Sequence, residues 1–326
     1  MNEVAPIGRE ELLSALGTLT SPAVLVHKNP DGDAVGSAVG LVRYLRARGV
    51  AAALLSPDPI PERLAFLTAG VPVYEGTPRE VVTVDVASLS QAGRLADTVT
   101  AAERVYMIDH HRMSVPYAPH YIRPEASAVG EVLYDLFSDS GAVRIPAEIA
   151  APLYAAIASD TGSFRFSNVT PATMMTAARL LECGIPADDI CHRLFDVRAE
   201  GELRAIAYAI GNTAQHFDGR LSMLAVSRAT LAELSCTDAD FDGVIETVRS
   251  RRGVEVAALI RERADGSVRL SLRTTGADAA SLCASFGGGG HRVAAGCSLP
   301  VSSAEEGARL LLTRIGCLFD ENGQKS

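Results

Sequence analysis

The segment Arg104-Val105-Tyr106-Met107-Ile108-Asp109-His110-His111 joins an apolar run to three polar residues. A short β-branched run of this kind is typical of a buried strand. Val81–Val86 is a second such run, and both runs end in acidic residues. These segments therefore predict strands that carry polar side chains at their carboxyl ends.

Strands and helices alternate on either side of this segment. Ala23–His27 and Ala51–Leu55 are two more apolar runs, and the stretch between them predicts a helix that passes through Leu41 and Leu45 and ends at Gly49. This alternation predicts a parallel sheet with helices on its faces, with ligands at the carboxyl ends of its strands. Further helices are expected at Ala128–Ser138, Ala147–Ser159, Thr173–Cys183 and Asp188–Phe195.

The pattern changes after Phe195. Arg198–Asn212 predicts a connecting helix. Three strands are expected after it, at Leu221–Val226, Val254–Arg261 and Val268–Leu272, with a hairpin turn at Arg263–Gly266 between the last two. A last helix is expected at Ala304–Leu318. The predicted fold class is α/β. A parallel-sheet domain with helices on both faces (residues 1–195) is joined by a helical linker (196–215) to a smaller α/β domain with a mixed sheet (216–326).

Composition restricts the function. The 326 residues carry a net charge of −9 and contain no Trp, which argues against duplex nucleic acid and against a long base-stacking groove. No stretch has the roughly 20 apolar residues of a membrane span, and the first residues lack the pattern of a secretory signal. We expect a cytoplasmic protein that binds no membrane, and its scattered cysteines favour reduced thiols: Cys183, Cys191, Cys236, Cys283, Cys297 and Cys317.

Four polar segments follow the predicted strands and helices of the first domain. They are His27–Asp33, Val84-Asp85, Asp109-His110-His111 and Ser159–Ser163. Taken singly, each has a simpler explanation: Asp85 as a helix cap or turn residue, Asp31-Gly32-Asp33 as a capping turn, the two histidines as one core and one surface residue, and Asp160-Thr161-Gly162 as a C-terminal turn. Together they favour a two-metal site, because Mn²⁺ accepts both carboxylates and imidazole and a metal pair needs a bridging carboxylate.

This pattern resembles the DHH phosphoesterase family, which is named for its Asp-His-His triplet. The resemblance implies that His27 and Asp31 hold one metal ion, that Asp33, His110 and Asp160 hold the other, and that Asp85 bridges the two. It also implies that Asp109 orients the histidines and that His111 faces the scissile phosphate. Two Mn²⁺ ions are the expected cofactors, with Mg²⁺ or Co²⁺ as alternatives.

A glycine run at Gly287–Gly290 precedes His291. It lacks the Lys-Ser/Thr of a P-loop, so the simpler interpretation is a flexible loop. The run resembles the DHH-associated C-terminal domain, which implies that Gly288, Gly289, Gly290, His291 and the strand residue Arg273 bind a substrate phosphate or nucleotide.

Within the family, a two-domain chain of this length is most similar to the nanoRNases that also dephosphorylate 3′-phosphoadenosine 5′-phosphate (pAp). The expected activity is hydrolysis of short single-stranded RNA to mononucleotides and removal of the 3′-phosphate of pAp. Cleavage of linear or cyclic dinucleotides and a non-catalytic nucleotide sensor stay open as alternatives. The sequence also leaves a homodimer open.

Overall fold

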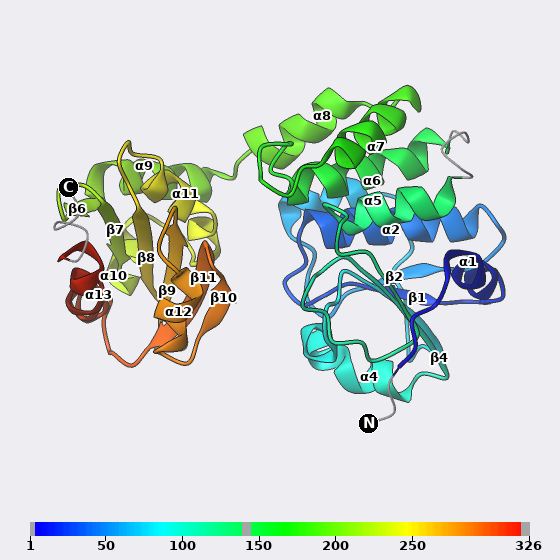
Figure 1. The fold of residues 1–326 in the computed structure, drawn as a ribbon, viewed down its shortest axis with the longest axis horizontal. Helices are drawn as coiled ribbons and strands as arrows, with labels where there is room; N and C mark the ends of the chain where they lie inside the picture. Colours follow the sequence, from blue (N-terminus) through cyan, green and yellow to red (C-terminus); the bar gives the residue numbers. More distant parts are fainter. Residues whose placement is uncertain (1–3, 139–144, 321–326) are drawn as a thin grey trace. The chain divides into compact units, whose positions relative to one another are not determined.

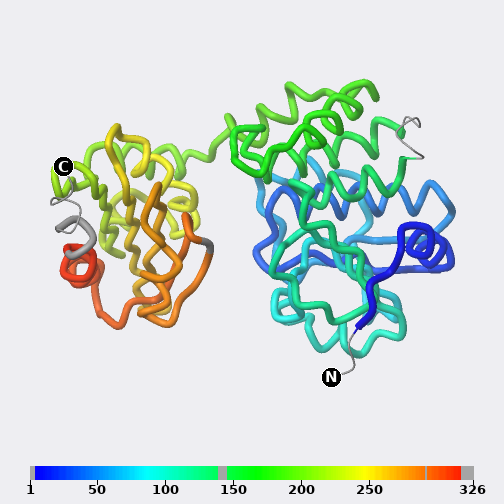
Figure 2. Tube along the Cα trace, viewed as in Figure 1, coloured from blue at the N-terminus to red at the C-terminus, as the bar shows by residue number. Residues whose placement is uncertain are grey.

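The computed structural model describes residues 4–138 and 145–320, without the side chains of His291 and residues 317–320. The chain forms two compact units, Met1–Val197 and Arg198–Ser326, and each is built from one continuous stretch (Figures 1 and 2). Helix α9 (Glu200–Asn212), which we expected to be a linker, belongs to the second unit, because its Ala205 and Ala209 are buried in that unit's core.

The first unit contains a five-stranded parallel sheet with the order β2-β1-β3-β4-β5. The strands are β1 (Ala23–Leu25), β2 (Ala53–Leu55), β3 (Glu80–Val84), β4 (Arg104–Asp109) and β5 (His120–Ile122). The predicted parallel-sheet domain is thus confirmed. Strand β5 was not predicted, because its three half-buried residues form a short edge without an apolar run.

Helices cover both faces of this sheet (Figure 1). Successive strand residues point to opposite faces, and accordingly Val24 and Val82 pack in one core while Leu25 and Val81 pack in another. The helical elements of the unit are α1 (Arg9–Gly17), α2 (Gly32–Arg46), η1 (Glu62–Leu64), α3 (Ala65–Thr68), η2 (Leu89–Leu95), α4 (Ala96–Ala101), α5 (Val129–Phe137), α6 (Ala147–Asp160), α7 (Pro171–Glu182), α8 (Ala187–Cys191) and η3 (His192–Asp196).

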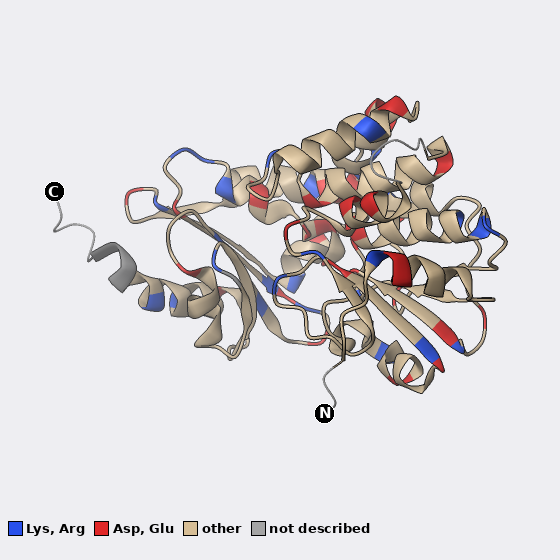
Figure 3. Ribbon diagram, turned by 45° about the vertical axis from the view of Figure 1, so that its right-hand side comes forward, with Lys and Arg blue, Asp and Glu red and all other residues tan. Residues whose placement is uncertain are grey.

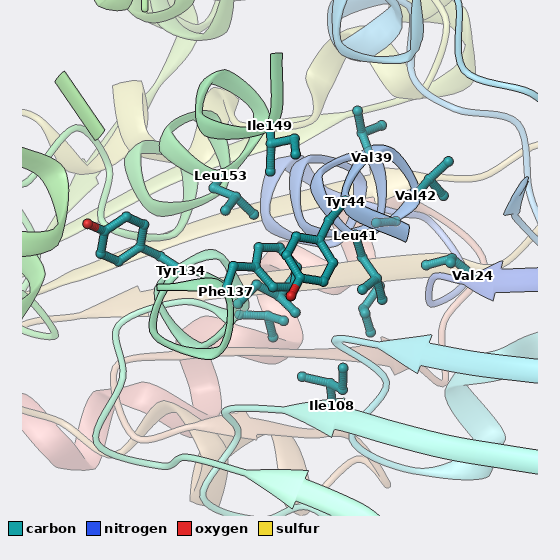
Figure 4. Close-up of a cluster of buried hydrophobic side chains, with 14 of the residues drawn as sticks. Val24, Val39, Leu41, Val42, Tyr44, Ile108, Tyr134, Phe137, Ile149 and Leu153 are labelled. Carbon is teal, nitrogen blue, oxygen red and sulfur yellow. The ribbon is translucent and has the colours of Figure 1, made fainter. Parts of the chain in front are cut away.

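The larger core lies between the sheet and helices α1, α2, α5 and α6. Figure 4 shows Tyr44 of α2 stacked on Phe137 of α5, with ring centroids 3.6 Å apart and planes 8° from parallel. Val24 and Ile108 contribute the sheet side of this core, and both are fully buried. Aliphatic burial of this kind stabilises the unit by about 25 cal/mol per Å² of apolar surface removed from water.

Glycines bring α2 unusually close to α6. A Cβ atom on Gly36 would lie 2.4 Å from the carbonyl oxygen of Pro152, and one on Gly40 would lie 2.5 Å from the side chain of Leu153. A Cβ on Gly32 would lie 2.3 Å from Ser159 Oγ. Gly32 stands between Asp31 and Asp33, and Ser159 precedes Asp160, so this contact brings two of the four polar segments together.

The second unit is a six-stranded mixed sheet with the order β10-β11-β9-β8-β7-β6, in which only β7 and β8 pair in parallel. Its strands are β6 (Ala214–His216), β7 (Leu221–Val226), β8 (Val256–Glu262), β9 (Val268–Thr274), β10 (Gly289–His291) and β11 (Ala294–Leu299). Besides α9, its helices are α10 (Arg228–Glu233), η4 (Ala239–Phe241), α11 (Val244–Arg249), α12 (Ala279–Ala284) and α13 (Ala304–Asp320).

Helices also cover both faces of this second sheet. Leu311 and Ile315 of α13 pack on one face, and Val244 and Val248 of α11 pack on the other. The predicted mixed-sheet domain is confirmed, although the sequence did not indicate β6, β10 or β11. In the part of the chain that the structure describes, no helix combines the length and apolar character needed to cross a membrane.

We predict that Gly36→Ala destabilises the first unit by about 1–3 kcal/mol, because the new Cβ meets backbone atoms that cannot move aside cheaply. Gly17→Ala is the matched control, since a Cβ at Gly17 meets no described atom within 4 Å. Urea unfolding followed by circular dichroism checks both variants. Equal unfolding midpoints for Gly36→Ala and wild type would contradict the close-packing account.

Candidate metal centre

Asp85 lies directly after β3 and is only 3% exposed. Its φ of +59° is rare for a residue with a side chain and is often found at functional sites. Oδ2 lies 3.5 Å from His27 Nε2, and Oδ1 lies 3.4 Å from His111 Nδ1. Oδ1 is buried without a hydrogen-bond partner among the described residues. An orphaned carboxylate oxygen surrounded by imidazoles is expected where a cation binds.

Two groups of ligand atoms meet at Asp85. His27, Asp31 and Asp85 form one group, and Asp33, His110 and Asp160 form the other; within each group the ligand atoms lie within 4.8 Å of one another. His110 Nε2 is 3.8 Å from an oxygen of each of Asp33, Asp85 and Asp160. These gaps are too long for hydrogen bonds, but two ligands at about 2.1 Å from one cation stand about 3–4 Å apart.

Backbone carbonyls fix the rings of two histidines. His27 Nδ1 lies 2.8 Å from the oxygen of Lys28, and His110 Nδ1 lies 3.1 Å from the oxygen of Ala126. Since a carbonyl only accepts, each Nδ1 must donate its proton, which leaves Nε2 of the neutral ring as a free lone pair. Both Nε2 atoms face the carboxylates, as a metal ligand requires.

Asp109 orients His111. Asp109 is fully buried, and its Oδ1 accepts a hydrogen bond from His111 Nδ1 at 2.9 Å, while Ser114 Oγ donates to Oδ2. The hydrogen bond to Asp109 and the surrounding carboxylates raise the pKa of His111 to about 9, against the effect of burial. We expected Asp109 to orient both histidines; the structure shows it bonded to His111, whereas a carbonyl holds His110.

Asp33 is held by three donors. Its carboxylate accepts from the backbone N–H groups of Val129 (2.7 Å) and Gly130 (3.1 Å) and from Ser37 Oγ (2.8 Å). Both N–H groups belong to the first turn of α5, whose amino end favours negative charge. The sequence did not indicate these contacts, because Val129 and Gly130 lie nearly one hundred residues from Asp33.

The carboxylates repel one another strongly. Burial, together with the charges of Asp85, Asp160 and Asp31, raises the pKa of Asp33 well above its ordinary value. Burial is also the main reason that the pKa of Asp160 rises to about 6. Burial opposes protonation of His27, but Asp31 and Asp85 outweigh it and raise the pKa of His27 to about 11. A divalent cation relieves this repulsion, so the donor set fits one.

Asp160 ends α6 and is steadied by Asn168, which the sequence analysis did not identify. Asn168 Nδ2 donates to the carbonyl oxygens of Asp160 and Ser127, both at 3.1 Å. All six expected metal ligands, and His111 with Asp109, are therefore brought together at the carboxyl edge of the first sheet.

The residues expected to bind substrate lie in the second unit. Arg273, on β9, donates from Nε to Glu246 Oε1 of α11 at 3.0 Å, and its side chain is 32% exposed. Its guanidinium is thus already paired with a carboxylate, which sequence spacing did not indicate.

The glycine run is not a flexible loop, because Gly289–His291 forms β10 and pairs with β11. A Cβ on Gly288 would lie 2.3 Å from Cys297 Cβ, and one on Gly290 would lie 2.5 Å from the oxygen of Ala294. Packing therefore accounts for these two glycines. Gly289, between them, differs: a Cβ there would meet no described atom within 4 Å. The side chain of His291 lies outside the described part of the chain.

Comparison with known proteins agrees with this arrangement. Residues 22–157 match the DHH family N-terminal domain, and residues 224–315 match the DHHA1 domain. The chain belongs to the DHH family. A Thermus thermophilus relative described as "Bifunctional oligoribonuclease and PAP phosphatase NrnA" is 33% identical over 90% of this chain and 91% of its own. A Bacillus subtilis relative of the same description is 24% identical over 93% and 96%.

A solved structure shares this DHH-family fold along nearly the whole chain. It is an exopolyphosphatase-related protein from Bacteroides fragilis, with a TM-score of 0.85 at 22% identity, covering 96% of this chain and 97% of the other.

We predict that Mn²⁺ stabilises the protein thermally, because ions that bind only the folded state add about 2.7 kcal/mol at one hundred times their Kd. Asp85→Asn should lose most of this gain, since it removes a carboxylate that belongs to the first group and lies 3.8 Å from His110 of the second. Asp97→Asn, on the exposed side of α4, serves as the control and should keep it. Melting curves with and without Mn²⁺ decide; an undiminished gain in Asp85→Asn would contradict the bridging position.

Proposed function

We propose that this DHH-family protein hydrolyses short oligoribonucleotides to mononucleotides and removes the 3′-phosphate of pAp, using two divalent metal ions. The observation that carries the proposal is the position of Asp85 between two groups of ligand atoms, with a buried oxygen that lacks a hydrogen-bond partner. The descriptions of two relatives that align over nine-tenths of the chain support the same activity.

Each group of ligands is assigned one ion. His27 and Asp31 would hold the first ion, and Asp33, His110 and Asp160 would hold the second, with Asp85 serving both. Mn²⁺ is the proposed ion because it accepts this mixture of carboxylate and imidazole; Mg²⁺ and Co²⁺ are the alternatives. When bound, such a pair supplies positive charge at the phosphoryl oxygens and lowers the pKa of water.

His111 is the proposed catalytic residue beside the metals. The hydrogen bond to Asp109 raises the pKa of His111, which favours the protonated ring, and the Nδ1 proton is committed to Asp109. Nε2 is then free to donate to a phosphate oxygen and to stabilise the charge that develops during cleavage. Asp109 and Ser114 hold the ring in this orientation.

The charge distribution favours small substrates. Lys and Arg residues are interspersed with Asp and Glu over both units, and no continuous basic strip is visible in the view of Figure 3. Neutralising many phosphates of a long duplex requires such a strip. The five described cysteines are free thiols, in keeping with the proposed cytoplasmic location.

In the second unit, Arg273, Gly289 and His291 are the proposed contacts to a substrate phosphate. Gly289 leaves room for close approach to the backbone, and Arg273 offers a guanidinium that exchanges Glu246 for phosphate. Gly288 and Gly290, which we also expected at this site, support it by allowing the pairing of β10 with β11.

We predict that, with Mn²⁺ present, a 5-mer RNA and pAp are hydrolysed rapidly while a structured 24-mer and a duplex are poor substrates. Chelation followed by metal-free dialysis should abolish turnover. Initial rates measured by chromatography test both points. Equal rates on the 5-mer and the 24-mer would contradict the preference for short substrates, and undiminished turnover without metal would contradict the metal mechanism.

We predict that Arg273→Ala raises KM for the 5-mer roughly 10- to 150-fold, because a charge-assisted hydrogen bond contributes about 1.5–3 kcal/mol. Arg273→Lys should recover only part of this loss, since an ammonium lacks the planar fork. Turnover of bis-p-nitrophenyl phosphate should change little. Arg269→Ala, four residues earlier on the same strand, is the control. A parallel loss on both substrates would show that Arg273 serves the fold or the chemical step.

A further inference from the structure

Three consecutive residues beyond Asp160 adopt left-handed backbone conformations. The φ angles of Gly162, Ser163 and Phe164 are +55°, +59° and +61°. Residues with side chains rarely adopt such angles, and runs of them persist only where the surroundings hold them. Here Ser163 N donates to the oxygen of Ala158 at 2.7 Å, and Phe164 N donates to Thr161 Oγ1 at 3.0 Å. The turn folds the chain back over the end of α6.

The turn presents the ring of Phe166 against Gly162. A Cβ on Gly162 would lie 2.3–2.6 Å from three atoms of that ring, so a side chain at position 162 would displace the ring. Phe166 nevertheless remains 53% exposed. Phe164, two residues earlier, packs against the core beside Tyr154, with ring centroids 5.9 Å apart. Phe164 therefore packs against the core, whereas the ring of Phe166 is partly exposed to solvent.

Arg165 is anchored to the same glycine. Its Nε donates to the oxygen of Gly162 at 2.6 Å, its side chain is exposed, and no carboxylate of the described residues forms an ion pair with it. Gly162 lies only two residues beyond Asp160, a separation of at most about 7 Å along the chain. An exposed aromatic ring and a guanidinium that forms no ion pair with the described residues thus lie near a proposed metal ligand.

We infer that Phe166 and Arg165 form a nucleotide subsite, in which Phe166 stacks on a nucleobase and Arg165 binds a phosphate other than the scissile one. One aromatic ring and one guanidinium suit a single nucleotide, because its base has a flat π-face that stacks on the ring and its phosphates are anionic. This inference rests on the proposed function and adds to it how the first unit recognises its substrate. The subsite requires a base, so it distinguishes nucleotides from other phosphate esters.

Binding of AMP and of ribose 5-phosphate, two ligands that differ only in the base, tests Phe166 by calorimetry in the same Mn²⁺ buffer. Wild type should bind AMP more tightly, and Phe166→Ala should weaken AMP binding roughly 5- to 150-fold while leaving ribose 5-phosphate unchanged. Phe166→Tyr should restore most of the preference. Leu181→Ala, an exposed apolar position on α7, is the control and should behave as wild type.

Arg165 is tested by kinetics on the dinucleotides pApA and ApA, which differ in the terminal phosphate. Arg165→Ala should raise KM for pApA at least tenfold with little change for ApA, and kcat should stay near that of wild type. Arg165→Lys should recover part of the loss. Each variant is first checked for an unchanged melting temperature, so that a folding defect is recognised.

Two results would overturn the inference. One is an equal loss of AMP and ribose 5-phosphate binding in Phe166→Ala, which would make the ring a support of the turn. The other is an unchanged preference for AMP in that variant. If wild type hydrolyses neither dinucleotide, the proposed function fails, but the calorimetric comparison still decides whether Phe166 recognises a base.

Discussion

Electrostatic repulsion among Asp31, Asp33, Asp85 and Asp160 is the constraint on which the first unit depends. These carboxylates come from three separate segments, and two of them, Asp33 and Asp85, are buried, where a charge costs far more than in water. The raised pKa values of Asp33 and Asp160 are the direct sign of that cost. The fold must hold the groups together until a cation offsets the repulsion.

Packing and hydrogen bonds keep these carboxylates close together. The glycines of α2 let α6 approach so closely that the residues flanking Gly32 lie next to the end of α6. The first turn of α5 donates two N–H groups to Asp33, and Asn168 ties Asp160 to the segment before α5. Elements that look like ordinary core helices thus position the candidate ligands, and the histidines are oriented by carbonyls and by Asp109.

The sequence was sufficient to predict that the candidate ligands lie close together, because each follows a strand or helix whose apolar pattern is clear; that they hold metal ions stays a prediction. Parallel strands bring their carboxyl ends to one edge, so Asp85 and the Asp109-His110-His111 triplet had to meet there. The family resemblance then assigned partners, and the distances around His110 agree with that assignment. The short edge strand β5 escaped prediction, since it has little apolar pattern to detect.

Contacts between distant segments could not be predicted. Asn168 and Ser114 are ordinary polar residues in the sequence, and only the fold brings them to Asp160 and Asp109. The glycine run was ambiguous for a related reason: spacing alone cannot separate a glycine needed for strand packing, such as Gly288, from one that leaves space open, such as Gly289. Nor did spacing indicate that Glu246 pairs with Arg273.

The most direct test of the central claim is anomalous X-ray diffraction at the manganese edge from crystals grown with Mn²⁺. The account predicts two peaks about 3.5–4 Å apart, one on each side of the Asp85 carboxylate. The first should lie beside His27 and Asp31, and the second beside Asp33, His110 and Asp160. A single peak, or two peaks that do not share Asp85, would contradict it.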